Sequence, residues 1–288
     1  MDKRLAELLR LLELERVEVN IFRGESRDIG SPQVYGGQVL GQALQAAYAT
    51  VTADRVVHSL HAYFLRRGDV NAPVVYFVDR SRDGHSFTSR RVTAIQHGEQ
   101  IFNLSASFQT PEAGFEHQLE MPSVPFPEQL PESYLPGSPA VEALSPRLKK
   151  FVYDRPIEFR AVPTAVSAAL PGSLRQHLWI RTIDRLPDGE QLHRCLLAYA
   201  SDFHLLTTAL VSHEATVAAG SLVIASIDHA MWFHRPVRMD EWLLYATDSP
   251  SASGARGFAR GSLFTRDGCL VASTAQEGLI RVLARTDR

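Results

Sequence analysis

The chain has 288 residues, of which 45% are hydrophobic, and a formal net charge of −2. This size allows one large hydrophobic core or two modest ones. Its 30 lysines and arginines are scattered and form no basic stripe, so we expect no nucleic-acid partner and no anionic membrane surface as a partner. The two cysteines, Cys195 and Cys269, lie far apart in sequence, which suits free thiols in a reducing compartment.

Residues 1–16 predict an amphipathic helix. Leu5, Leu8, Leu9 and Leu12 recur at helical spacing, and charged residues occupy the other face. A signal peptide would need an uninterrupted apolar stretch, and no run in the chain approaches the ~18 apolar residues of a membrane span. The last residues lack the Ser-Lys-Leu peroxisomal signal. We therefore expect a cytoplasmic protein that has no membrane partner.

A second helix is predicted from Gly36-Gly37 onward, where Leu40, Leu44, Ala47 and Val51 repeat with helical spacing. Strands should follow it, because apolar runs alternate with turn sequences such as Arg82-Asp83-Gly84. The expected strands lie at about 56–66, 73–80, 86–97 and 100–109.

The composition then changes sharply between Thr110 and Pro146. Prolines stand at positions 111, 122, 125, 127, 131, 136, 139 and 146. Proline at this density should not sustain a helix or a central strand. We interpret residues 111–149 as a linker between two units, residues 1–110 and residues 150–288.

The second unit shows the same order of elements as the first. Leu192, Leu196, Tyr199, Phe203 and Leu206 predict a helix. The strands expected after this helix lie at about 222–234, 242–248, 256–266 and 269–282.

A repeated sequence pattern supports a duplication. When Phe64-Leu65-Arg66 is aligned with Phe233-His234-Arg235, Tyr76 falls on Tyr245 and Asp79 falls on Asp248. Such a repeat indicates two diverged copies of one supersecondary unit. One helix followed by an antiparallel meander in each copy predicts the α+β class, with a sheet wrapped around each helix.

Several common catalytic motifs are absent from the sequence. There is no GxSxG nucleophile elbow, no GxxxxGK[ST] phosphate loop and no GxGxxG dinucleotide fingerprint. His58 and His61 are an odd number of residues apart in a predicted strand and should point to opposite faces, as should His229 and His234. We therefore expect no metal site from these pairs.

Asp202 is the residue that stands out as a candidate for chemistry. It continues the apolar stripe that Cys195, Tyr199 and Leu206 form on the second unit's helix. A carboxylate on such a stripe loses solvation, which is costly unless it is paired or hydrogen-bonded. Functional sites hold such groups, but a purely structural role is an equally ordinary explanation, with Asp202 capping a backbone group or turning outward at the helix end.

Ser226 and Gln276 are candidate companions of Asp202. Each lies in a predicted strand, and taken singly each is more often a satisfied polar group than a catalytic one. Together with Asp202 they offer a carboxylate, a hydroxyl and an amide that can hold and deprotonate one water. His58 is a weaker candidate base, since a histidine on a strand is usually a half-buried structural residue.

At these residues the sequence resembles the acyl-CoA thioesterase II family over nearly its whole length. The matching stretches are Val34–Gln38, Val57–Phe64, Ala106–Glu116, Tyr199–Asp202, Asp228–Pro236 and Gln276–Gly278.

The resemblance implies a double hotdog fold and hydrolysis of acyl-CoA to a fatty acid and coenzyme A. It implies no cofactor and no metal, since an aspartate, a serine or threonine, and a glutamine activate the water. Carried over position by position, these residues are Asp202, Ser226 and Gln276. Serine stands where threonine is more expected, which keeps the hydroxyl and removes a methyl that restrains its rotamer. The resemblance also implies assembly into a homo-oligomer, a dimer or tetramer.

Two other functions compete with hydrolysis. One is a hotdog hydratase or dehydratase, although the GDxNPxH-like stretch is missing. The other is a non-catalytic acyl-CoA-binding protein, for which a desolvated carboxylate offers no advantage. For a thioesterase we expect broad preference for medium to long acyl chains, in a tunnel beside the second helix lined by Tyr199, Phe203, Leu206 and Met231–Phe233.

Overall fold

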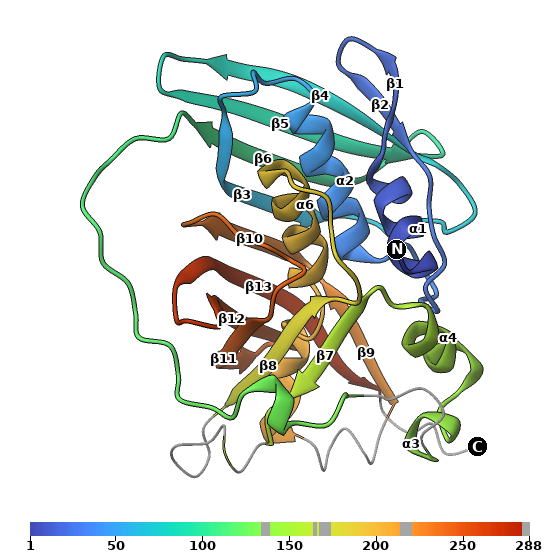
Figure 1. Cartoon of the computed structure of the whole chain (residues 1–288). Helices are drawn as coiled ribbons and strands as arrows, with labels where there is room; N and C mark the ends of the chain where they lie inside the picture. Colours follow the sequence, from blue (N-terminus) through green and yellow to red (C-terminus); the bar gives the residue numbers. More distant parts are fainter. Residues whose placement is uncertain (134–138, 164–165, 167–173, 214–220, 284–288) are drawn as a thin grey trace.

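Two helices, one from each half of the chain, lie side by side inside antiparallel strands (Figure 1). The structure, a computed structural model, describes residues 1–133, 139–163, 166, 174–213 and 221–283. The α+β class and the double hotdog architecture predicted from the sequence are confirmed.

The N-terminal half carries the helix α2 within a curved sheet. Its leucine-rich first helix, α1, buries Leu5, Leu8, Leu11 and Leu12. The elements of this half are α1 (Lys3–Leu12), β1 (Glu15–Glu18), β2 (Ile21–Gly24), α2 (Gly36–Tyr48), β3 (Val56–Phe64), β4 (Val74–Asp83), β5 (Phe87–Gln96) and β6 (Glu99–Gln109).

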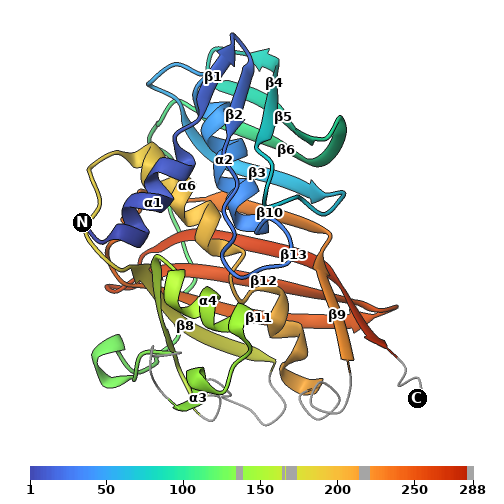
Figure 2. The same cartoon turned by 90° about the vertical axis from the view of Figure 1, so that its right-hand side faces the viewer.

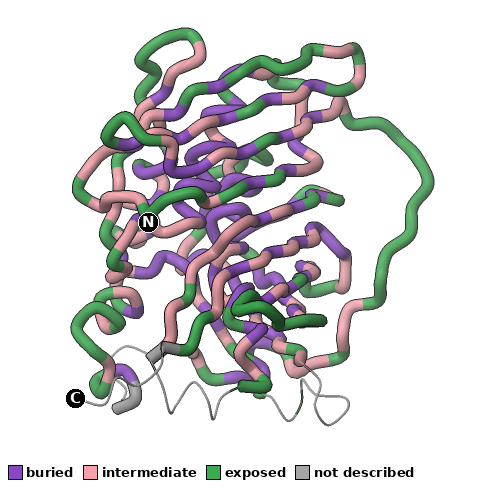
Figure 3. The backbone as a smooth tube through the Cα atoms, turned by 180° about the vertical axis from the view of Figure 1, so that it is seen from behind, coloured by how far each residue is buried: buried purple, intermediate pink, exposed green. Residues whose placement is uncertain are grey.

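The C-terminal half repeats this plan around the helix α6. Between the halves, residues 110–126 contain no helix or strand and run along the outside of the molecule (Figures 1 and 3). The elements that follow are η1 (Pro127–Gln129), α3 (Pro139–Glu142), α4 (Pro146–Asp154), β7 (Ile157–Ala161), β8 (Arg175–Thr182), α6 (Glu190–Ser201), η2 (Leu206–His213), β9 (Ser221–Ser226), β10 (Asp228–Phe233), β11 (Leu243–Ser253), β12 (Arg256–Thr265) and β13 (Leu270–Leu283).

The strands of both halves join in one antiparallel sheet. Its order is β1-β2-β4-β5-β6-β3-β10-β13-β12-β11-β8-β7, and β9 pairs with β13 beside this path. The junction is the pair β3–β10, with Leu60 opposite Met231. Figure 2 shows β10 and β13 continuing the upper strands into the lower ones. Because β3 and β10 share main-chain hydrogen bonds, neither half ends in a free strand edge there.

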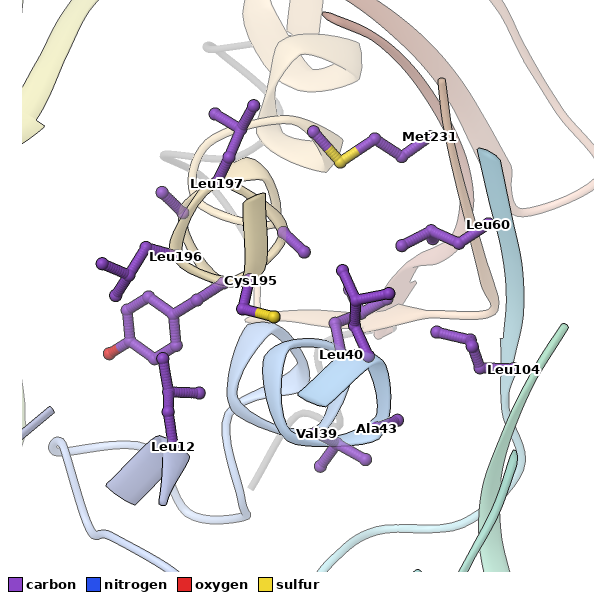
Figure 4. Packing of buried hydrophobic residues seen from close by; sticks show 14 of the residues in the cluster. Leu12, Val39, Leu40, Ala43, Leu60, Leu104, Cys195, Leu196, Leu197 and Met231 are labelled. Atoms are coloured by element: carbon purple, nitrogen blue, oxygen red, sulfur yellow. The ribbon is translucent and has the colours of Figure 1, made fainter. Parts of the chain in front are cut away.

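The helices α2 and α6 run antiparallel and form the centre of the core. Gln191, at the start of α6, donates a hydrogen bond of 3.0 Å to Gln45 near the end of α2. Between them, the Cys195 backbone carbonyl lies close to Gly41. Leu60, Leu104 and Met231 close this core from the sheet side, and Leu40 of α2 faces them (Figure 4). The N-terminus of α2 therefore meets the C-terminus of α6.

The structure differs from the sequence prediction at helix starts in the proline-rich segment. The helices α3 and α4 begin at Pro139 and Pro146, although proline density there was expected to prevent helices. Proline fits the first helical turn, where its missing N–H has no intrahelical partner. At α4 the Ser145 hydroxyl also accepts a hydrogen bond from the Leu148 N–H, which caps the helix.

One helical segment, Glu190–His213, is long and apolar enough to span a membrane by length and composition alone. Most of its apolar stretch is buried inside the protein. This segment contains α6, which packs against α2, so its apolar character serves the core.

Candidate active site

The C-terminus of α6 places Asp202 at the meeting point of the two helices. The helix ends at Ser201, and Asp202 is its C-cap, with φ −79° and ψ −14°. Two residues later His204 has a positive φ of 63°, which turns the chain away from the helix axis. Asp202 thus lies at a helix end, where a purely structural aspartate could turn outward to solvent. Its side chain is instead partly buried and points at the sheet.

Gln276 of β13 joins Asp202 to Ser226 of β9. Its amide Nε2 donates to Asp202 Oδ1 at 2.8 Å and to Ser226 Oγ at 3.0 Å. A carboxylate only accepts hydrogen bonds, so the amide nitrogen must face Asp202. The other amide atom, Gln276 Oε1, is buried and has no partner among the described residues. The structure thus brings together the three residues predicted from the sequence.

A break in the predicted strand 222–234 gives Ser226 and Gln276 their positions. The strand divides at Ile227 into β9 and β10, and the register on β13 shifts by one residue between the two. Asp228 holds this irregularity, because its carboxylate accepts the Glu277 N–H at 2.7 Å. Such an irregularity bends a strand and redirects side chains, and here it turns Ser226 and Gln276 toward Asp202.

The N-terminal half contributes the first turn of α2. A Cβ on Gly36 would lie 2.7 Å from Asp202 Oδ2, and one on Gly37 would clash with the Tyr199 carbonyl. Tyr35, the residue before α2, donates its hydroxyl hydrogen to the same carbonyl at 3.0 Å. Its ring stacks on Phe203 with a centroid distance of 4.4 Å. Glycines are therefore required where the two helix ends approach, and Tyr35 fastens them together.

Opposing effects set the pKa of Asp202. Burial raises it above the usual value for aspartate, since the charged form loses solvation. Hydrogen bonds from Gln276, the Gly37 N–H and Ser226 lower it, without cancelling the effect of burial. The result is a carboxylate with increased basicity that three donors keep in one orientation.

A buried network lies behind Asp202 and holds the end of α6. The Tyr245 hydroxyl donates to the Ser201 carbonyl at 3.0 Å and lies 2.9 Å from Thr274 Oγ1. Ser201 Oγ lies 3.0 Å from His229 Nε2. Burial lowers the pKa of His229 to about 4, so its ring is neutral near pH 7. These contacts fix the backbone from which the Asp202 side chain projects.

A cavity of about 230 Å³ is lined by Ser226, one of the three residues. Ser226 and Gly36 line one part of it, next to Asp202, and Arg66 and Arg67 line another. Its remaining walls are largely apolar and come from both halves of the chain.

The other sequence candidates lie elsewhere. His58 Nε2 lies 2.8 Å from Ser107 Oγ, and its ring packs edge-on against Phe87, both in the N-terminal sheet. Its contacts include none of the three site residues. Burial lowers the pKa of His58, as expected for a structural histidine. Within the described part of the chain, no three His, Cys, Asp or Glu side chains lie close enough to hold a metal ion.

Most of the expected tunnel residues form core instead of lining this cavity. Tyr199, Phe203, Leu206, Met231 and Phe233 are all buried, and none of them lines the cavity beside Ser226. Phe203, for example, is enclosed by Tyr35, Tyr199 and the ring of Phe159.

Sequence reasoning missed the part that α2 plays in the site. The sequence predicts Gly36 and Gly37 as a helix start within the family-matching stretch Val34–Gln38, and it assigns them no role in the site. Two adjacent glycines in a first helical turn cost helix stability, and Tyr35 offers no side-chain cap. That cost was a signal that another backbone or side chain approaches closely at this point.

Comparison with known proteins agrees with this architecture. The profile described as "Acyl-CoA thioesterase" matches residues 147–279, and "Acyl-CoA thioesterase N-terminal domain" matches residues 23–109. The chain is 44% identical to "Acyl-CoA thioesterase 2" of Haemophilus influenzae, over 98% of this chain and 99% of that protein.

Solved structures give the same result. The acyl-CoA thioesterase II TesB2 of Mycobacterium marinum is 46% identical and superposes with a TM-score of 0.82, covering 96% of this chain and 99% of that one. A hotdog-fold protein of unknown function from Alicyclobacillus acidocaldarius is 19% identical with a TM-score of 0.77, covering 96% and 99%, and shares the fold. The fold and these matches define a hotdog thioesterase. The chain belongs to the acyl-CoA thioesterase II family, and the predicted enzyme class, a thioester hydrolase, is confirmed.

Proposed function

We propose that this enzyme hydrolyses acyl-CoA by direct attack of a water, with Asp202 as general base and Ser226 and Gln276 as the groups that orient that water. The observation that carries the proposal is the hydrogen-bonded set of Asp202, Gln276 and Ser226 at the N-terminus of α2. The increased basicity of Asp202 suits proton abstraction better than an ordinary exposed carboxylate does.

The reaction proceeds without a covalent enzyme intermediate. Asp202 removes a proton from the water as the water oxygen bonds to the thioester carbonyl carbon, and the carbonyl electrons move to oxygen. The tetrahedral intermediate collapses, the C–S bond breaks, and the thiolate takes the proton back from Asp202. Gln276 Oε1, a buried acceptor, is suited to orient the second hydrogen of the water.

The developing oxyanion needs donors that are in place beforehand. The first N–H groups of a helix have no intrahelical acceptor, and the N-terminus carries partial positive charge. The first turn of α2 provides such groups beside Asp202. Because the Gly37 N–H is directed at Asp202, we assign the neighbouring Gly36 N–H as the oxyanion donor.

We propose a broad preference for medium to long acyl chains. Each buried methylene contributes about 0.8 kcal/mol, so kcat/KM should rise with chain length and then level off. A sharp optimum at two to four carbons would contradict this preference while leaving the hydrolysis intact.

We also propose a homo-oligomer, a dimer or tetramer, in the cytoplasm. Tyr63 and Trp232 leave 53% and 37% of their surfaces exposed on adjacent strands of the central sheet. Large aromatic side chains in this position suit a protein interface. Light scattering on the purified chain tests the assembly, and a monomer at micromolar concentration would contradict it.

Release of free thiol from acyl-CoA tests the function. A thioesterase releases one thiol per substrate, a hydratase changes the absorbance of an enoyl-CoA without releasing thiol, and a binding protein does neither. We expect stoichiometric thiol and fatty acid, with no acyl adduct in the mass of the intact protein. Binding of acyl-CoA with no thiol release would overturn the proposal.

A further inference from the structure

The cavity beside Ser226 has two chemically different parts. Ser226 and Gly36, which adjoin Asp202, line one part, and Arg66 and Arg67, whose side chains are exposed, line another. Its other walls are mainly apolar, formed by Val34, Val39, Phe64, Leu65, Ile101 and Phe102. At about 230 Å³ the cavity is smaller than the roughly 300–1,000 Å³ pockets of drug-sized ligands, so it suits a narrow part of a larger molecule.

The duplication provides an internal comparison for the two arginines. Arg66 Nη1 donates to the Gln100 carbonyl at 2.7 Å, and its counterpart Arg235 donates to the Leu270 carbonyl at 2.9 Å. Each contact ties the end of a central strand to its neighbour in the same half. Because both copies keep this contact, Arg66 has a structural role.

Arg67 has no such role. The second copy has Pro236 at the corresponding position. Arg67 makes no hydrogen bond or ion pair with any residue that the structure describes. Two carboxylates of this region already have partners: Asp69, two residues after Arg67, pairs with His97 at 3.0 Å, and Glu99 pairs with Arg66 at 3.0 Å. The positive charge of Arg67 is thus free for a ligand at the mouth of the cavity.

We propose that Arg67 binds a phosphate group of the CoA portion of the substrate, while the cavity holds the pantetheine arm that leads to the thioester beside Ser226. This assignment rests on the proposed function. A guanidinium presents several N–H donors to phosphate oxygens, and a narrow, mainly apolar channel suits the uncharged arm. The arm then delivers the thioester sulfur to the Asp202 end, and the bulky nucleotide stays outside.

Kinetics with two thioesters of the same acyl group test this assignment. Acyl-CoA carries the phosphates and acyl-pantetheine lacks them. For Arg67→Gln, the ratio of kcat/KM for acyl-CoA to kcat/KM for acyl-pantetheine should fall about three- to tenfold, mainly through KM for acyl-CoA. The rise of KM with salt concentration should also become shallower, because one screened ion pair is lost.

A matched control is Arg185→Gln. Arg185 is also an exposed arginine, but it lies before α6, at the end of the helix pair opposite Asp202. This variant should keep the wild-type ratio. A third substrate, acyl-dephospho-CoA, separates the two phosphate positions: if Arg67 binds the 3′-phosphate, Arg67→Gln should leave its kcat/KM near that of wild type, and if it binds the diphosphate, the decrease should persist.

Equal changes for acyl-CoA and acyl-pantetheine, or no change for either, would overturn the assignment of Arg67. Failure of the proposed function itself has a different signature, because the wild-type enzyme would then release no thiol from either substrate.

Discussion

At the scale of single residues, the site is held at a cost to stability. Asp202 is drawn away from water, and burial raises its pKa despite three hydrogen-bond donors. When the pKa of an acid is higher in the folded protein than in the unfolded chain, protonation favours folding. The resulting penalty is absent at low pH and grows as the pH rises from the ordinary aspartate range through the raised pKa.

Asp202→Asn should therefore stabilise the protein at neutral pH. An amide carries no charge to desolvate, so Tm at pH 7 should rise by about 2–5 °C. The difference should shrink as the pH falls through the raised pKa of Asp202, because the wild-type carboxyl then becomes protonated. Thermal unfolding across this pH range checks the prediction, with Asp248→Asn in the exposed pair with Arg260 as a control. A lower Tm at pH 7 would show that hydrogen bonding outweighs burial.

Ser226 and Gln276 should act as a unit. Gln276 contacts both Asp202 and Ser226, so in our proposal the loss of Ser226 or of Gln276 disturbs the same water. Ser226→Ala and Gln276→Ala should each lower kcat, and the double variant should lose less than the product of the two effects. If the effects of the two single variants simply multiplied in the double variant, the two groups would not share a water.

At the scale of elements, the candidate site depends on the contact between α2 and α6 as much as on the side chains of Asp202, Ser226 and Gln276. Gly37 lies against the Tyr199 carbonyl, and Gly36 lies against the Asp202 carboxylate. A side chain at either position must push the helix ends apart. We therefore expect Gly37 to matter mainly for helix packing and Gly36 to matter mainly for the position of the Asp202 carboxylate.

Gly37→Ala should destabilise the protein by about 1–3 kcal/mol, because its Cβ meets backbone that cannot move aside. Gly36→Ala should chiefly lower kcat, since its Cβ meets the Asp202 carboxylate, the proposed general base, and the ring of Phe64. Denaturant unfolding and thiol-release rates separate the two effects. Gly114→Ala is the control, as a Cβ there has no neighbour within 4 Å. Equal effects of both variants on stability and rate would contradict this division.

The sequence predicted the central elements well and the sheet edges poorly. Long periodic segments such as α2 and α6 carry strong hydrophobic patterns. The sequence does not predict the last two strands at each end of the sheet, which are β1 and β2 at one end and β8 and β7 at the other. The exposed β1 and the five-residue β7 are too short or too polar for clear alternation. Their positions depend on pairing with distant strands.

The site was predictable in composition but not in geometry. Asp202 stood out because a charge interrupts an apolar stripe, and Ser226 and Gln276 were selected through family resemblance. The break at Ile227 depends on the hydrogen bond between Asp228 and the Glu277 N–H, a contact between residues 49 positions apart. No local pattern encodes such a pairing. The approach of α2 from the other half is equally a tertiary effect.

At the scale of the whole molecule, the two halves share one core and, in our proposal, one site. The strand pair β3–β10 and the helix pair α2–α6 both cross between them. In the proposed division into residues 1–110, 111–149 and 150–288, the first and last ranges are thus repeats that form the core only together.

A fragment of residues 150–288 should consequently fail to fold alone. It would expose the edge of β10 and the apolar face of α6 that α2 covers. We expect aggregation, or a species without cooperative unfolding, in circular dichroism and size-exclusion chromatography. A soluble monomer with a cooperative transition would contradict the shared core.

The most direct test of the account is kcat for acyl-CoA hydrolysis by Asp202→Asn, measured as thiol release on protein whose fold is verified. Asparagine keeps the shape of the side chain and removes the base. Because loss of a general base typically costs on the order of 10²–10⁴-fold, kcat should fall by that factor while acyl-CoA binding is retained. A well-folded Asp202→Asn enzyme with near-wild-type kcat would contradict the central claim that Asp202 activates the water.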